Sequence, residues 1–482
     1  MKNKIVLCHG VFDLIHAGHL AYFEKAKTFG DTLVVSITSD KYVNKGPGRP
    51  YFNQDVRSKM LKALSLVDDV IISDNPRATE VINKIKPDFY VKGPDYKNHE
   101  DDISGGILEE VEAVEKNGGQ VVYTEDQVYS SSHLLNRFFS KNTDEQNDTI
   151  AFIKKTGGFD LIKDLVQRME NLDVSVVGEP ILDIYRFCDP QGVSSKSPSL
   201  SVKYSREEKY NGGSFAIINH VSSFVKSATL YTNNKTTFEQ HKILANNVLV
   251  KHGHKGIDVV EKIRYISEEK GQRLLEVTKM NENTWHNFTL DEKREFIDHI
   301  FYNNKSDLML MCDFGHGFFD EEVIRMSEGF KGYKALNCQT NSSNFGFNPF
   351  TKFNNFDYLS IDLREARVAY HNKNSCAEAL FGRMCRDYSN RSISMTLGPK
   401  GAFFYQKGAV FASPTFADQI VDTIGAGDAY YAITALLNSV RAPSQFIPFL
   451  GNVFAGLKTK IIGNKQAVSK VDFLKAVEAI LK

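Results

Sequence analysis

The feature that most constrains the fold is a regular alternation of short β-rich runs with helix-like segments over the first 140 residues. The β-rich runs are "KIVLCHGVF", "DTLVVSITSD", "DDVIISD", "DFYVKG" and "QVVYTED", and the segments between them have helical periodicity. A last helix is expected over "SSSHLLNRFF", which opens with three hydroxyl residues. Strands that alternate with helices pair in parallel, so this part predicts a doubly wound parallel sheet.

The rest of the chain predicts a second α/β domain. A length of 482 residues is too great for one ordinary core. The polar stretch 140–150 is typical of a linker, and a helix is expected over about 150–171. The run "DVSVVGEPILDIY" then predicts one strand, residues 200–280 are rich in short strand candidates, and αβ alternation returns after 300. The expected boundaries are 1–140, a linker and helix over 141–171, and 172–482.

Composition limits the partners and the compartment. Lys+Arg and Asp+Glu balance at 59 each, so the chain has no excess of positive charge to attract nucleic acid, which is disfavoured as a partner. The six cysteines are dispersed and form no CxxC pair, which favours free thiols in a reducing compartment. The start of the chain does not resemble a signal peptide, and no apolar run reaches the roughly 18 residues of a membrane span. We therefore expect a cytoplasmic protein without a membrane partner.

Two histidines stand three residues apart in "GVFDLIHAGH", directly after the first predicted strand. Ligands of open α/β sheets bind at the carboxyl ends of strands, and a helix N-terminus there offers N–H groups to phosphate. His16 and His19 can donate hydrogen bonds to a triphosphate as charge builds up during a displacement. Gly10 and Gly18 allow close approach of backbone and ligand. Two readings remain open from this motif alone, namely surface histidines near a cap and a metal pair that lacks a carboxylate or cysteine companion.

Together with "KGPGRP", "VKGPDY" and "YSSSHLL", this motif resembles the HxGH nucleotidyltransferase superfamily, which has the cytidylyltransferase-like fold. The resemblance implies that His16 and His19 stabilise the transition state at the α-phosphate and that Lys45 neutralises phosphate charge. It implies that Asp13 helps to position the loop, with Arg49 close by. The nucleotide-binding residues that it implies are Gly10, Phe12, Asp13, Arg49, Ser130, Ser131 and Ser132.

Within that superfamily, "GVFDLIHAGH", "KGPGRP" and "VKGPDY" are most similar to the adenylyltransferase part of the bifunctional ADP-heptose synthase family. The implied reaction is attack of a sugar 1-phosphate on the α-phosphorus of a nucleoside triphosphate, with release of pyrophosphate. Mg²⁺ would screen the triphosphate charge. The motifs do not distinguish ATP from CTP at this site.

The second half contains "VDTIGAGDAYYA", residues 421–432. Gly425, Ala426 and Gly427 at the start of a predicted helix can form an anion-binding nest for developing phosphoryl charge. Asp428 is placed to take a proton from an attacking hydroxyl. From the residues alone, a tight turn that leads into a helix explains the same pattern.

This element, with "YNGGSFAIIN", "TLGPKGAFFY" and "VVGEPILDIY", resembles the PfkB, or ribokinase-like, sugar kinase family. The resemblance implies a second doubly wound domain with a small β lid, ATP as substrate, Asp428 as the catalytic base and Asp183 as a sugar ligand. "EKIRYIS" adds Lys262 and Arg264 as phosphate contacts, although a solvated strand face would explain them too. The further implied ligands of substrate are Gly212, Gly213 and Asn219, and those of nucleotide are Asp362, Glu365, Gly398, Gly425, Ala426 and Gly427, with Glu365 also a metal candidate.

Two departures from the kinase pattern concern the substrate more than the chemistry. The usual N-x-x-E element reads Asp362-Leu-Arg-Glu365, which keeps an oxygen ligand but adds negative charge. His316, in "CDFGHG", stands where the heptose kinases usually have lysine.

The two resemblances predict a bifunctional enzyme whose domains are in the reverse of the order known for ADP-heptose synthases. We expect phosphorylation of a heptose 7-phosphate at its anomeric hydroxyl and nucleotidyl transfer to the sugar 1-phosphate, for lipopolysaccharide or capsule. Three alternatives stay open: another sugar or polyol phosphate with CTP, a kinase-like half that only binds or dimerises, and, least favoured, a nucleic-acid-binding protein. Ribokinase-like kinases often dimerise through their lid strands, so a homodimer or larger homo-oligomer is expected.

Overall fold

A computed structural model describes residues 3–43, 49–93, 106–124, 142–235, 245–280, 285, 287–342, 344–417 and 420–482. The chain divides into two compact units, residues 1–143 with 471–482, and residues 144–470. Each unit is described by itself.

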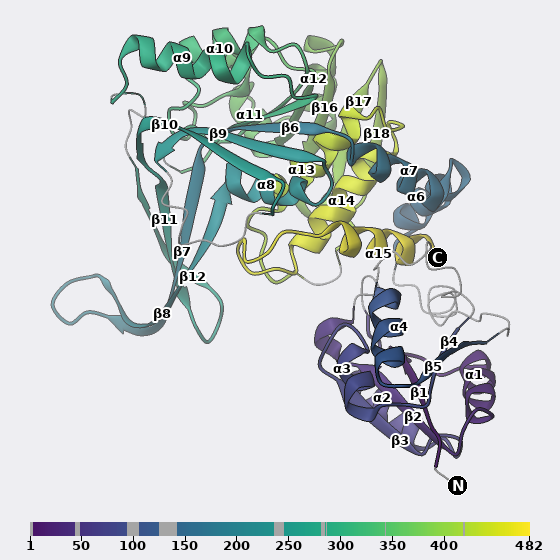
Figure 1. Cartoon of the computed structure of the whole chain (residues 1–482). Helices are drawn as coiled ribbons and strands as arrows, with labels where there is room; N and C mark the ends of the chain where they lie inside the picture. The colour runs from purple at the N-terminus through teal and green to yellow at the C-terminus, as the bar shows by residue number, and fades with distance from the viewer. Residues whose placement is uncertain are drawn as a thin grey trace. The chain divides into compact units, whose positions relative to one another are not determined.

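The first unit is built on a five-stranded parallel sheet in the order β3-β2-β1-β4-β5 (Figure 1). Because β1 lies in the centre and the order reverses beside it, the sheet is doubly wound, as predicted. The strands are β1 (Ile5–Gly10), β2 (Thr32–Thr38), β3 (Asp69–Ser73), β4 (Phe89–Lys92) and β5 (Gln120–Tyr123).

Helices cover both faces of this sheet. Phe23 of α1 and Leu61 of α2 belong to one apolar cluster, whereas Ile82 of α3 and Val114 of α4 belong to another. The two clusters share the central strand, because alternate residues of β1 point to opposite faces. The helix expected over 130–139 lies outside the described residues. The described helices are α1 (Ala17–Lys27), α2 (Gln54–Lys62), α3 (Thr79–Ile85) and α4 (Gly106–Lys116).

The second unit is built on a nine-stranded sheet in the order β10-β9-β6-β13-β14-β15-β16-β17-β18. The first seven strands of this order pair in parallel, and β17 and β18 add an antiparallel edge. The strands are β6 (Asp173–Gly178), β9 (Ser227–Lys235), β10 (Val248–Asp258), β13 (Leu308–Asp313), β14 (Tyr333–Cys338), β15 (Tyr358–Asp362), β16 (Ser392–Thr396), β17 (Ala402–Gln406) and β18 (Ala409–Ser413).

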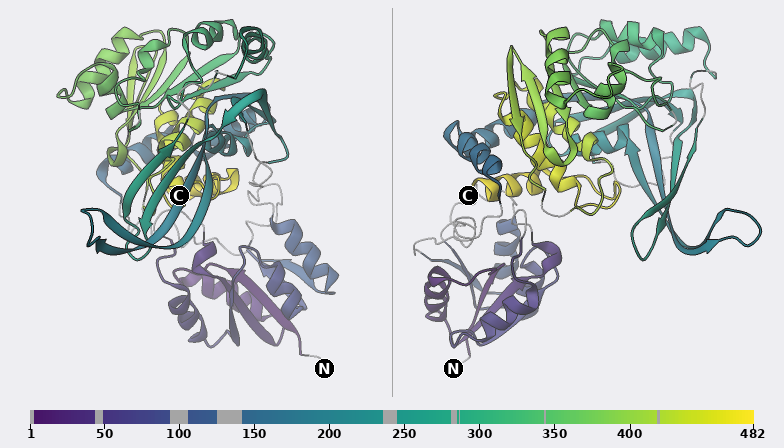
Figure 2. Two further views of the ribbon diagram at one scale, coloured as in Figure 1. Left: turned by 90° about the vertical axis from the view of Figure 1, so that its left-hand side faces the viewer. Right: turned by 180° about the vertical axis from the view of Figure 1, so that it is seen from behind.

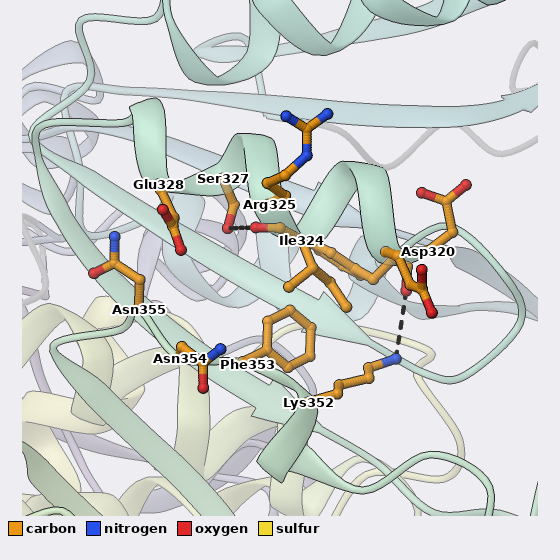
Figure 3. Close-up of a pocket in the computed structure, with 11 residues that line it drawn as sticks. Asp320, Ile324, Arg325, Ser327, Glu328, Lys352, Phe353, Asn354 and Asn355 are labelled. Atoms are coloured by element: carbon orange, nitrogen blue, oxygen red, sulfur yellow. Dashed lines mark hydrogen bonds between the residues drawn. The ribbon is translucent and has the colours of Figure 1, made fainter.

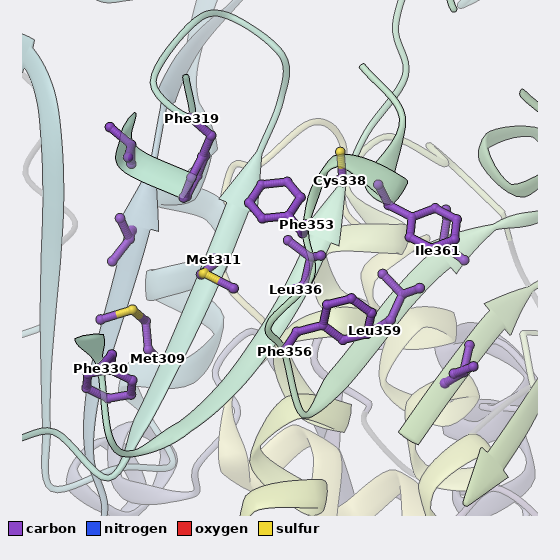
Figure 4. Close-up of a cluster of buried hydrophobic side chains, with 14 of the residues drawn as sticks. Met309, Met311, Phe319, Phe330, Leu336, Cys338, Phe353, Phe356, Leu359 and Ile361 are labelled. Atoms are coloured by element: carbon purple, nitrogen blue, oxygen red, sulfur yellow. The ribbon is translucent and has the colours of Figure 1, made fainter. Parts of the chain in front are cut away.

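Side chains from β13, β14 and β15 pack into a buried cluster rich in methionine and phenylalanine (Figure 4). Met311, Leu336 and Leu359 line one face of these neighbouring strands, and Phe353 and Phe356 pack against them. This core holds the carboxyl ends of the strands in fixed relative positions. The helices of the unit are α6 (Asp144–Lys155), α7 (Gly158–Met169), α8 (Ser214–Ser222), α9 (Leu290–Phe301), α10 (Glu321–Met326), α11 (Leu363–Ala369), α12 (Ala377–Asp387), α13 (Ala426–Ser439) and α14 (Phe446–Lys458). The last helix of the chain, α15 (Lys470–Leu481), belongs to the first unit except for its first residue.

A separate four-stranded sheet, in the order β12-β11-β7-β8, extends away from the nine-stranded sheet (Figure 2). The long antiparallel pair β7–β8 forms most of its length, and β11 pairs in parallel with β7. This is the expected small β lid. Its strands are β7 (Pro180–Val193), β8 (Leu200–Gly213), β11 (Val260–Ser267) and β12 (Arg273–Lys279).

Three details differ from the expectations. The single strand expected over 173–185 is two strands, β6 and β7, which separate at Glu179 and belong to different sheets. The single helix expected over 150–171 is two helices, because Gly157 and Gly158 adopt positive φ of 130° and 55° between them. The first of these helices begins at Asp144, inside the stretch expected to be a linker.

Candidate active sites

His16 and His19 lie together at the N-terminus of α1, directly after the exit of β1. His16 is the N-cap, and its Nδ1 accepts a hydrogen bond of 3.1 Å from the backbone N–H of Gly18. The two imidazole rings stack with centroids 3.9 Å apart, and Phe12 packs edge-on against His19 at 5.3 Å. Because Nδ1 of His16 is an acceptor, the neutral ring carries its proton on Nε2, which is then a hydrogen-bond donor. Partial burial lowers the pKa of His16 and so favours this neutral form.

Asp13 fixes the loop that follows β1. Its carboxylate accepts hydrogen bonds from the backbone N–H of Tyr51 at 2.7 Å and of Phe52 at 2.9 Å, and Arg49 donates to it at 3.2 Å. Asp13 and Arg49 are both nearly buried in this pair. The structure therefore brings Asp13 and Arg49 together, and gives Asp13 the positioning role that the family resemblance implies.

Gly10 and Phe12 form the base of this site. A Cβ at Gly10 would lie 3.0 Å from the ring of Phe12, so the glycine is needed for packing of that ring. Phe12 has a positive φ of 48° and is buried. Lys45, Ser130, Ser131 and Ser132 lie outside the described residues, and their roles stay predictions.

Arg57 is a buried residue of this site that the motifs did not reveal. Its guanidinium is fully buried and donates to the carbonyls of Val11, Thr38 and Phe52 and to the carboxylate of Asp40, at 2.6 to 3.0 Å. It thus ties the exits of β1 and β2 to the loop that Asp13 holds. The only sequence signal for the buried role of Arg57 was its place among the apolar residues on one face of an amphipathic helix.

In the second unit, the predicted nest stands at the start of α13. Gly425 is the N-cap and has φ 75° and ψ 4°, a left-handed conformation that glycine adopts readily. A Cβ at Gly425 would lie 2.7 Å from Oδ1 of Asn464, whereas a Cβ at Gly427 would meet nothing within 4 Å. Ala426 follows Gly425 as the first helical residue. The first turn of α13 therefore has open space beside Gly427 into which a ligand can approach.

Asp428 lies in that first turn, 9% exposed, and Nε2 of Gln339 donates to its carboxylate at 2.6 Å. Burial raises the pKa of Asp428 to about 6, and the negative charge of Asp183 acts in the same direction. Lys262 and Lys458 oppose this rise. A carboxylate with such a pKa is charged at neutral pH and accepts a proton more readily than an exposed aspartate does.

Asp183, at the start of the lid, shares this site. Its carboxylate forms a buried ion pair with Arg264, which also pairs with Glu276 at 2.8 Å. A Cβ at Gly212 would lie 2.2 Å from Oδ2 of Asp183, so only glycine fits there. Burial lowers the pKa of Lys262, which interacts electrostatically with both Asp183 and Asp428. A solvated strand face does not describe Arg264, which is buried in these ion pairs, and Lys262 beside it is half-buried.

Asp362 and Glu365 form a capping box at the N-terminus of α11. Asp362 accepts from the N–H of Glu365 at 2.6 Å, and Glu365 accepts from the N–H of Asp362 at 2.9 Å and from that of Thr340 at 3.2 Å. Burial and the neighbouring Asp362 raise the pKa of Glu365 to about 8. Each carboxylate oxygen of Glu365 accepts one backbone hydrogen bond and keeps a lone pair free of these bonds. Its role as a metal ligand stays a prediction.

The remaining predicted ligands lie at separate points around the cluster. Gly398 has φ 59° and follows β16, at the same sheet edge as Asp362. Gly213 has φ 61° and its added Cβ would meet the carbonyl of Glu179 at 2.6 Å. Asn219, on α8, lines a small hollow together with Asn464 rather than the space beside Gly427.

Sequence reasoning missed Gln339 and Asn464, whereas it had singled out His316 as a departure from the kinase pattern. Gln339 follows β14 and Asn464 approaches Asp183 at 3.4 Å, and neither belongs to a motif that was used. His316 is 3% exposed, and neither of its ring nitrogens has a hydrogen-bond partner among the residues that the structure describes. Burial and the charge of Lys262 lower the pKa of His316 to about 3, so the ring is neutral.

A hollow of about 660 Å³ is a surface groove between α10 and residues 352–355 (Figure 3). Phe319, Ile324 and Phe353 provide its apolar wall, and Asp320, Glu328 and Lys352 its charged groups. None of the predicted site residues lines it. Lys352 instead forms an ion pair of 2.6 Å with Asp313 at the end of β13.

Two family models match the chain, one within each unit. A model of the cytidylyltransferase-like family matches residues 7–137, and a model of the pfkB family of carbohydrate kinases matches residues 355–442. The first unit is therefore cytidylyltransferase-like, and the second has the ribokinase-like PfkB fold.

Curated relatives include two proteins named Bifunctional protein HldE. That of Campylobacter concisus is 43% identical over 116 residues, and that of Methylobacillus flagellatus is 44% identical over 106 residues. These matches cover 24% and 22% of this chain and 24% and 21% of the relatives. The matched part thus spans about a quarter of the length of each of these relatives.

Solved structures with a similar fold include phosphofructokinase-2 from Escherichia coli in complex with potassium and the same enzyme in complex with substrates and products. The TM-score is 0.51 in both cases, with 14% and 13% identity, 64% of this chain and 100% of the solved chain. At these identities the likeness shows the fold alone.

In the part of the chain that the structure describes, no helix combines the length and apolar character needed to cross a bilayer.

Proposed function

We propose that the chain is a bifunctional sugar kinase and sugar 1-phosphate nucleotidyltransferase, with the two domains in the reverse of the usual ADP-heptose synthase order. The observation that carries the kinase half is the buried Asp428 beside an open glycine turn, within electrostatic reach of Asp183 and Lys262. The stacked His16–His19 pair at a helix N-terminus supports the transferase half.

In the kinase step, the anomeric oxygen of the sugar attacks the γ-phosphorus of ATP. The new phosphorus–oxygen bond forms as the bond to the β-phosphate oxygen breaks, the hydroxyl proton passes to Asp428, and ADP leaves. The N–H groups of the first turn of α13 face the growing charge. Asp183, held by Arg264, accepts hydrogen bonds from sugar hydroxyls.

In the transferase step, an oxygen of the sugar 1-phosphate attacks the α-phosphorus of the nucleoside triphosphate. The bond between the α- and β-phosphates breaks and pyrophosphate leaves. His16, through the proton on Nε2, and His19 donate hydrogen bonds to the α-phosphate as its charge grows. Both families would use Mg²⁺ to screen the triphosphate charge, and the chain's own contribution is these donors and the loop held by Asp13.

We propose a heptose 7-phosphate as the first substrate and ATP as the nucleotide at both sites, with an ADP-sugar for lipopolysaccharide or capsule as the product. The resemblance of the N-terminal motifs to those of ADP-heptose synthases supports the heptose, although the part matched in the curated relatives is only about a quarter of their length. The proposed homo-oligomer would form through the lid sheet, where Leu200, Tyr204 and Leu275 are exposed apolar side chains.

The kinase reaction is expected to lose rate in mild acid. Asp428 accepts a proton only as a carboxylate, and its pKa is about 6, so kcat/KM for sugar phosphorylation should rise from pH 5 to pH 7 with its midpoint near pH 6. ADP release measured across this range checks the prediction. If kcat/KM for sugar phosphorylation were the same at pH 5 and pH 7, once ionisation of the substrate phosphates is taken into account, this result would contradict the role of Asp428 as base.

The decisive experiment is a panel of ATP and CTP against sugar phosphates, in which ADP and pyrophosphate are measured separately. ADP release with a heptose 7-phosphate and pyrophosphate release with a heptose 1-phosphate are expected. Pyrophosphate release without ADP release for any sugar would favour the alternative in which the kinase-like half only binds or dimerises. Turnover with CTP and another sugar or polyol phosphate would favour the other alternative.

A further inference from the structure

Lys458 is a fully buried lysine at the end of α14, a helix whose other residues are mostly apolar. Its Nζ donates to the backbone carbonyl of Ile424 at 2.8 Å and to that of Gly463 at 2.6 Å. Lysine is rarely buried completely, since an ammonium group loses its hydration unless charges or carbonyls replace it. The two carbonyls therefore hold a cation inside the protein.

Asp422 holds the same two residues through their N–H groups. Its carboxylate accepts from the N–H of Ile424 at 3.0 Å and from that of Gly463 at 2.8 Å, and Tyr185 donates to it at 2.9 Å. Ile424, in the loop that leads into the nest, and Gly463, in the segment after α14, are thus each held by a carboxylate at the N–H group and by an ammonium at the carbonyl. Such a double attachment leaves Ile424 little freedom to turn its carbonyl away.

The position of Lys458 relates this cation to the phosphate-binding turn. A Cβ at Gly425 would lie 3.3 Å from Cε of Lys458. Burial lowers the pKa of Lys458, whereas Asp422, Asp428 and Asp183 oppose this fall and favour the charged form. A lysine with a purely structural role would need only its two hydrogen bonds. This one also interacts electrostatically with the proposed base and with the proposed sugar ligand.

Backbone carbonyls grouped around a dehydrated positive charge are the arrangement that proteins use to bind K⁺. One of the solved structures with a similar fold is a complex with potassium. In the present chain the ammonium is covalently attached, so it cannot dissociate.

We propose that Lys458 is a built-in monovalent cation for the kinase site, which fixes the turn before Gly425 and supplies positive charge there in place of a dissociable K⁺. Lys458 is a positioning residue, since it acts through the turn and not on the substrate. This proposal rests on the proposed kinase function, and it implies that sugar phosphorylation by this chain needs no added monovalent cation.

The test uses the full chain and two variants. Lys458→Ala leaves a gap between the two carbonyls that K⁺ or NH₄⁺ can enter, whereas Lys458→Met fills much of the gap without charge. Lys373→Ala, an exposed lysine in a loop, is the control. ADP release and thermal unfolding are measured in the chlorides of K⁺, NH₄⁺ and tetramethylammonium at one ionic strength.

The wild type and Lys373→Ala should keep the same rate and melting temperature in all three salts. Lys458→Ala should lose about 100-fold in kcat in tetramethylammonium, the loss expected when a supporting change displaces the groups that position the substrate. K⁺ or NH₄⁺ should increase the kcat of Lys458→Ala at least about tenfold and raise its melting temperature, because the cation again satisfies the carbonyls. Lys458→Met should stay slow, with a melting temperature that does not respond to the salt.

Three results would overturn the proposal: a wild type that requires K⁺, a folded Lys458→Ala with full rate in tetramethylammonium, or a Lys458→Ala in which K⁺ and NH₄⁺ change neither rate nor melting temperature. If the wild type phosphorylates no sugar, the proposed kinase function fails. The melting temperatures then still decide whether the space left by Lys458 holds a cation.

Discussion

Asp428→Asn is expected to lower kcat for sugar phosphorylation by about 10³-fold, within the range that general base catalysis contributes, and to leave pyrophosphate release by the other domain unchanged. The amide keeps the shape and burial of the side chain and can still contact Gln339, but it cannot take a proton from the sugar hydroxyl. ADP release at saturating substrate measures the first activity, and pyrophosphate release from NTP and a sugar 1-phosphate measures the second.

A matched control is Asp291→Asn, which makes the same chemical change at an exposed carboxylate in the first turn of α9. Both activities of this control should equal those of the wild type. If Asp428→Asn remained folded and phosphorylated sugar at the wild-type rate, Asp428 would not be the base and the kinase assignment would lose its main support.

His16→Ala is expected to lower nucleotidyl transfer by about 10² to 10³-fold, the usual effect of removing one transition-state donor, with sugar phosphorylation near normal. The variant loses the Nε2 donor and also the N-cap of α1, so part of its effect is on the helix start. His16→Asn separates the two effects, because asparagine is a good N-cap but does not place a donor where Nε2 lies.

The control for this pair is His371→Ala, which removes an exposed imidazole from a loop of the second unit. Pyrophosphate release should be low in both His16 variants and unchanged in the control. If His16→Asn kept full transferase activity, the imidazole would serve only as a cap. If His16→Ala abolished ADP release as well, in a chain that still folds, the two-site interpretation would be wrong.

The elements that the sequence predicted well are those whose signals are local. The strands β1 to β5 were predictable because each is an apolar run followed by a turn or a helix start. His16 and His19 stand one turn apart on a helix, so their proximity follows from helical spacing. The glycine turn before Asp428 was predictable for the same reason, since a left-handed N-cap favours glycine.

The parts that were missed depend on contacts between distant segments. Gln339 reaches Asp428 from 89 positions away in the chain, and Lys458 reaches Ile424 from 34. No spacing rule relates such residues before the sheet is assembled. The division of residues 173–185 into two strands was missed because β-rich segments stand on both sides of Glu179 and Pro180, and the change of sheet at Glu179 is set by its partners.

The hydrogen bonds of Glu179 connect the lid to the loop that carries His316. Glu179 is the one residue between β6 of the main sheet and β7 of the lid, and its carboxylate accepts from the N–H groups of Phe314, His316 and Phe318 at 3.0 to 3.1 Å. Its own carbonyl accepts from the N–H of Ser214, where β8 leads into α8. Glu179 therefore holds together the corner between β6 and β7, the end of β8 and the loop that carries His316. A change of the angle of the lid at this corner would therefore also move the backbone of the loop that carries His316.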